Sequence, residues 1–161
     1  MAITSKRKHQ SRYVPCTTLE EDLKDIKILL EAIRKLQISE RVKKRMLVHA
    51  LWQIAMVTGN TQSSFFGRFR SEAVIRETGL KIERDHIYRK ENLIRELLGL
   101  SPDLDRIVAR AHCCVVTKDE HVKLGAVDAE IDGWERYRAA GITVYDMAAT
   151  PAQPITDFKN V

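Results

Sequence analysis

Two short segments constrain the fold of this chain more than any other part of it. The segment 80–86 alternates apolar and polar residues and ends on an acid followed by a histidine. The segment 113–116 is apolar and half β-branched, and Thr117 and Glu120 follow it with the spacing of a helix capping box. Alternation and β-branching favour strands. The sequence therefore predicts two short strands, with a helix carrying His121 directly after the second.

The remainder of the chain is mostly helical in pattern. Apolar residues recur at helical spacing after Thr17 and Thr18, and again from Ser39 to a stop at Gly59. We therefore expect an α+β fold that is mostly helical, with a small core of two short antiparallel strands packed on a helix. The expected parts are a basic flexible arm in residues 1–15 and a helical N-terminal region in residues 16–79. The strand–strand–helix core follows in residues 80–125, and a C-terminal helix with a short strand and tail in residues 126–161.

Composition narrows the classes of function only slightly. The chain has 161 residues, and its 27 Lys and Arg against 22 Asp and Glu give a net charge of +5, which permits a polyanionic partner without requiring one. The three cysteines contain no C-x-x-C pair, which argues against a four-cysteine zinc knuckle and fits a reducing compartment. No apolar stretch approaches the ~20 residues of a membrane span. We expect a cytoplasmic protein without a membrane partner.

The residues at the ends of these segments suit phosphodiester hydrolysis. A neutral imidazole such as that of His86 can take a proton from an attacking water. Carboxylate and imidazole ligands, here Asp85 and His121, suit a divalent ion that stabilises the developing charge. A single histidine is more often structural. Two of them 35 residues apart along the chain, in matching strand and helix contexts, make a site the stronger interpretation.

Two motifs resemble those of the HNH, or ββα-metal, endonucleases: Arg84-Asp-His-Ile-Tyr-Arg-Lys90 and Cys114-Val-Val-Thr-Lys-Asp-Glu-His121. The resemblance covers about residues 80–125 and extends more weakly to Ala50-Leu-Trp52 and Trp134-Glu-Arg-Tyr137. It implies that His86 is the general base. It also implies that Asp85 and His121 hold one divalent ion, Mg2+ first, with Mn2+ or Zn2+ as alternatives.

The chain departs from the HNH pattern at the middle residue of the motif, the asparagine. The asparagine found there in many members has no clear counterpart, since Thr117 or Asp119 occupies that neighbourhood and Asn92 comes too early. The structural zinc cysteines of some members are also absent. A catalytically decayed HNH core that binds nucleic acid or acts as a regulator is therefore the alternative to a DNA endonuclease.

A third interpretation, from the amphipathic pattern of residues 17–36, is an interaction module. DNA is the expected partner in the first two interpretations. The sequence leaves the oligomeric state open, a homodimer included. We expect basic side chains near the site to contact the phosphates of the nucleic acid. These candidates are Arg84, Arg89, Lys90 and Arg110.

Overall fold

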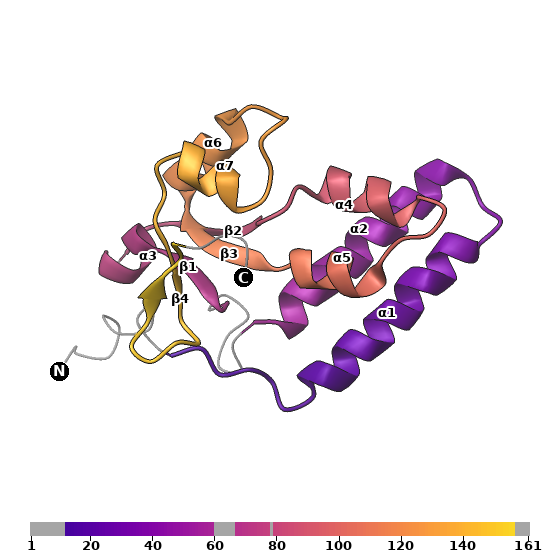
Figure 1. Ribbon diagram of the computed structural model, residues 1–161, viewed down its shortest axis with the longest axis horizontal. Helices are drawn as coiled ribbons and strands as arrows, with labels where there is room; N and C mark the ends of the chain where they lie inside the picture. The colour runs from indigo at the N-terminus through magenta and orange to yellow at the C-terminus, as the bar shows by residue number, and fades with distance from the viewer. Residues whose placement is uncertain (1–11, 60–66, 78, 157–161) are drawn as a thin grey trace.

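The computed structural model describes residues 12–59, 67–77 and 79–156, and they form an α+β fold (Figure 1). The helices are α1 (Leu19–Lys35), α2 (Glu40–Val57), α3 (Glu72–Arg76), α4 (Lys90–Leu97), α5 (Leu104–Arg110), α6 (Lys118–Ala126) and α7 (Trp134–Ala139). The strands are β1 (Phe69–Ser71), β2 (Ile82–His86), β3 (Cys113–Thr117), β4 (Val144–Asp146) and β5 (Gln153–Pro154). The predicted α+β, mostly helical class is confirmed. No helix in the described ranges is both long enough and apolar enough to cross a membrane.

Four helices pack together on one side of the molecule. The long helices α1 and α2 form an antiparallel pair, and α4 and α5 cover them (Figure 1). Fully buried leucines from three of these helices, Leu30, Leu51 and Leu93, meet in their shared core. Helices α1 and α2 precede the predicted boundary at 79–80, whereas α4 and α5 follow it, in the connection between β2 and β3. The boundary therefore separates helices that share one core.

The sheet is mixed, with the order β2-β3-β1-β4-β5. β2 runs antiparallel to β3, whereas β1 lies parallel to β3 on its other side. The predicted pair of strands is therefore one end of a five-stranded sheet, and β2 is its edge strand. The sequence did not predict β1 or β5. Each has at most three residues, too few for an alternating pattern to be recognised.

The predicted antiparallel pair of strands is present, with α4 and α5 between β2 and β3 in the chain. Asp85 pairs with Cys114, and His86 pairs with Cys113. The predicted capping box is confirmed, because Thr117 accepts from the Glu120 amide while the Glu120 carboxylate accepts from the Thr117 amide. Helix α6 follows without a loop and contacts both strands. The start of α6 is thereby fixed beside the start of β2, where Thr117 pairs with Ile82 and the Lys118 amide donates to the Lys81 carbonyl.

A second core lies between the sheet and the helices α6 and α7. Its buried members include Cys114, Leu124 and Trp134. The predicted C-terminal helix is α7, which begins at Trp134 after Gly133 with a φ of 62°. Residues 1–11 of the predicted arm lie outside the described residues. Tyr13 of the same predicted arm is buried, and its amide donates to the carbonyl of Met147, so that position packs against the C-terminal segment.

Candidate active site

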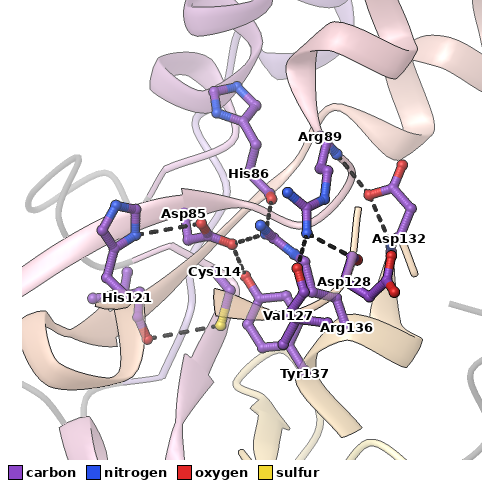
Figure 2. Close-up of polar contacts among 12 residues, drawn as sticks. Asp85, His86, Arg89, Cys114, His121, Val127, Asp128, Asp132, Arg136 and Tyr137 are labelled. Carbon is purple, nitrogen blue, oxygen red and sulfur yellow. Dashed lines mark hydrogen bonds and ion pairs between the residues drawn. The ribbon is translucent and has the colours of Figure 1, made fainter. Parts of the chain in front are cut away.

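Asp85, near the C-terminal end of β2, and His121, in the first turn of α6, lie side by side (Figure 2). The Nδ1 atom of His121 lies 3.3 Å from Oδ1 of Asp85. The carboxylate is 8% exposed and the imidazole is 48% exposed, so solvent reaches the pair from the histidine side. The structure therefore brings together the two residues that the sequence predicted as metal ligands.

The other oxygen of Asp85 is held from inside the protein. Its Oδ2 accepts a hydrogen bond of 2.6 Å from the Tyr137 hydroxyl and forms an ion pair with the Arg136 guanidinium (Figure 2). The same nitrogen of Arg136 donates to the main-chain carbonyl of His86 at 2.7 Å. Burial and the nearby negative groups raise the pKa of Tyr137 well above its ordinary value, so this hydroxyl remains a donor. Asp85 is thus oriented by α7, with Oδ1 left toward His121.

The imidazole of His86 points away from this pair (Figure 2). Successive side chains of a strand face opposite sides of the sheet, and Asp85 and His86 are consecutive in β2. The ring of His86 lies instead against Trp52 of α2, edge to face, with 4.4 Å between the centroids. The structure does not bring His86 together with Asp85 and His121 on one face of the sheet.

His86 is nevertheless poised as a neutral group. It is 5% exposed, and burial, followed by the nearby Lys90 ammonium, lowers its pKa to about 4. A hydrogen bond with the main chain of Leu51 opposes that shift. Its Nε2 atom is buried, with no hydrogen-bond partner among the residues that the structure describes. An imidazole in this state keeps a lone pair at neutral pH, which a general base requires, but a pKa of about 4 makes it a weaker base than an ordinary imidazole.

The donor atoms of Asp85 and His121 fit a divalent ion. Two ligand atoms on one ion, each about 2.1 Å from it, lie roughly 3.0–3.4 Å apart, and the observed separation is 3.3 Å. Within the described residues no group of three or more His, Cys, Asp or Glu side chains is arranged to hold an ion. Further ligands would come from water and a bound phosphate, as Mg2+ commonly has them. Arg136 neutralises Asp85, which weakens the attraction for a cation.

The four predicted phosphate contacts fall into two groups. Arg84 and Lys90 both lie over the indole of Trp52, beside His86. Arg89 instead donates to the carbonyls of Val127 and Asp128, which ties the start of α4 to the loop after α6. Arg110 forms an ion pair with Glu96 and stacks over Tyr88. Arg84 and Lys90 are therefore placed together near the site, whereas Arg89 and Arg110 make contacts within the protein.

Three residues of this site were not predicted from the chemistry of the sequence. Trp52 covers His86, while Arg136 and Tyr137 hold Asp85. The only signal for them was the weak extension of the HNH resemblance to Ala50-Leu-Trp52 and Trp134-Glu-Arg-Tyr137. Both extensions contribute side chains that contact the two predicted residues at the end of β2.

No family model, curated protein or solved structure matches this chain. The HNH resemblance therefore depends on the residues of the two motifs and on where the structure places them.

Proposed function

We propose that this protein is a metal-dependent endonuclease of the HNH type that hydrolyses phosphodiester bonds in DNA. One observation carries the proposal: His121 Nδ1 lies 3.3 Å from Asp85 Oδ1 in a strand–strand–helix arrangement. A carboxylate and an imidazole at this spacing are suited to share an ion. When bound, a divalent ion stabilises negative charge on the phosphate and the leaving oxygen.

In this proposal Asp85 and His121 hold the ion, with Mg2+ expected first. Arg136 and Tyr137 fix the Asp85 carboxylate so that one oxygen stays available. His86 is the general base that takes the proton of the attacking water at Nε2. Because Trp52 covers that ring and His86 lies on the face of β2 opposite Asp85, proton transfer requires the indole to move and the scissile phosphate to lie at the edge of β2, within reach of both faces. Catalytic contacts are often incomplete without substrate.

A second candidate is favoured by two specific contacts. Asp85 is already neutralised by Arg136, and His86 is buried on the opposite face of β2. Both features suit a decayed HNH core that binds nucleic acid without cleaving it. The two candidates differ in whether metal-dependent cleavage occurs.

Nicking of supercoiled plasmid in Mg2+ or Mn2+, and its loss in a chelator, tests the proposal. His121→Ala should lower metal affinity, measured by calorimetry on the free protein. Removing a residue that only supports a metal ligand typically lowers affinity by roughly 10-fold to 100-fold, so removing a ligand itself should cost at least as much. His86→Ala should abolish nicking and leave metal affinity unchanged. His49→Ala, an exposed histidine of α2, is the matched control and should change neither.

Two results would contradict the nuclease. Unchanged metal affinity in His121→Ala would return that residue to a structural role. Wild-type protein that binds DNA but never nicks it, with either metal, would favour the decayed core.

A further inference from the structure

Four side chains form a compact cluster on the face of β2 opposite Asp85. We call Trp52, Arg84, His86 and Lys90 the Trp52 cluster. The Lys90 ammonium lies 5.0 Å from the centroid of the indole, and the Arg84 guanidinium carbon lies 5.8 Å from it. The His86 ring meets the indole edge on. The indole itself is half-buried, so part of it faces solvent.

The charge of the cluster is positive. In the described ranges, none of the ion pairs involves Lys90. The fourth member, His86, is an imidazole and offers no negative charge to offset the two cations. An aromatic ring between cations is the combination with which proteins bind single strands: bases stack on the ring while cations contact the phosphates.

We propose that the Trp52 cluster is a subsite for an unpaired nucleotide of single-stranded DNA. The base stacks on Trp52, and the phosphates beside it contact Lys90 and Arg84. This inference rests on the proposed function, because it takes DNA as the substrate. It adds a preference for unpaired strands, since both faces of a base inside a duplex are already covered by its neighbours.

The position of β2 in the sheet connects this subsite to the candidate active site. β2 is one of the two edge strands, so its two faces meet along an edge that no other strand of the described sheet covers. Asp85 lies on one face and the Trp52 cluster on the other. A DNA strand that crosses this edge can place a base on Trp52 and an adjacent phosphate near Asp85 and His121.

The relative strengths of the contacts favour binding. A cation over an exposed ring contributes roughly 2-fold to 5-fold to an equilibrium constant. Stacking of one base contributes roughly 5-fold to 150-fold. A base can therefore displace the Lys90 ammonium from the indole with a net gain, and that ammonium then neutralises a phosphate.

Fluorescence titration in a chelator tests this proposal without cleavage. The chain has two tryptophans, and Trp134 is buried in the second core, so Trp52→Phe serves as the blank. A single strand of about 12 nucleotides, within the site sizes of single-strand binders, should quench Trp52. The same sequence as a blunt duplex should bind at least about 5-fold more weakly.

Substitutions give a second measurement. Trp52→Ala should weaken single-strand binding by roughly 5-fold to 150-fold. Lys90→Ala should reduce the slope of log affinity against log salt by about 0.7. The matched control is Lys35→Ala, which removes an exposed lysine of α1 and should leave that slope unchanged.

Equal quenching by duplex and single strand would overturn the preference for unpaired bases. Unchanged affinity in a folded Trp52→Ala variant, checked by circular dichroism, would overturn the subsite. If that variant unfolds, the wild-type titration and Lys90→Ala decide instead. Single-strand binding without nicking removes the nuclease and keeps the subsite, whereas nicking without a Trp52 response removes only the subsite.

Discussion

The ion pair between Arg136 and Asp85 is the most consequential contact at this site, and Arg136→Met tests it. Both side chains are nearly inaccessible, with 6% and 8% exposed. Methionine keeps much of the aliphatic volume of arginine and removes the charge and the donors. The variant leaves the Asp85 carboxylate buried, with Tyr137 as its remaining strong donor from α7.

Removing one partner of a buried ion pair typically costs about 3–5 kcal/mol, because the other charge stays behind without compensation. The Arg136 side chain also donates to the His86 carbonyl, so the upper half of that range is expected. Since domains of this size are stable by about 5–15 kcal/mol, the variant should still fold. Asp85→Asn should cost a similar amount, because it leaves the guanidinium unpaired.

The double variant separates coupling from simple additivity. With both charges removed, the loss should be at least about 2 kcal/mol smaller than the sum of the two single losses. Urea denaturation in a chelator, followed by fluorescence, measures all four proteins. Additivity within about 0.5 kcal/mol, or a loss below about 1 kcal/mol in Arg136→Met, would refute the inference that these two charges stabilise each other.

Adding metal extends the same experiment to the site. Without Arg136 the carboxylate keeps its full charge toward a cation. Mn2+ should therefore stabilise Arg136→Met more than it stabilises the wild type, by up to about 2.7 kcal/mol at 100 times the dissociation constant. Asp85→Asn should lose this response. An equal response to Mn2+ in all three proteins would mean that the ion binds elsewhere.

Two further predictions concern stability. Burial, followed by the Arg68 charge, lowers the pKa of His112 from 6.5 to about 4, so the unfolded chain takes up a proton there first as the pH falls. The free energy of unfolding, measured in urea, should therefore decrease by ~1–3 kcal/mol between about pH 6.5 and pH 4, and His112→Gln should lose that part of the slope. Gly133→Ala should destabilise by about 1–3 kcal/mol, because its Cβ would lie 2.5 Å from the Tyr88 ring at a φ of +62°. Gly125→Ala is the control, since nothing lies within 4 Å there, and thermal melts that rank both variants alike would contradict the steric reason.

The parts predicted correctly from the sequence depend on contacts between near neighbours in the chain. Helices α1 and α2 follow from apolar spacing, and the start of α6 follows from a capping box three residues long. The approach of Asp85 and His121 also depends on a contact between distant segments, because β2 and α6 meet only where β2 pairs with β3. Local patterns of this kind remain readable in a single sequence.

The parts that were missed depend on distant partners. Arg136 lies 51 residues after Asp85, and its arginine could equally have been a solvated surface residue. A carboxylate at the end of a buried strand needs a partner, but the sequence holds many candidate cations. Arg89 illustrates the converse: its place in the motif suggested a phosphate contact, whereas the carbonyls of Val127 and Asp128 accept from it.

The position of His86 follows from how the two cores are joined. The connection between β2 and β3 carries α4 and α5, which pack with α1 and α2, and Tyr88 contacts both cores. The end of β2 is therefore held at the junction between the helical core and the sheet. This attachment brings Trp52 of α2 over His86, while α6 and α7 cover the other face at Asp85. Neither Trp52 nor Arg136 belongs to the strand–strand–helix segment. The burial and contacts of Asp85 and His86 are therefore set by elements outside that segment.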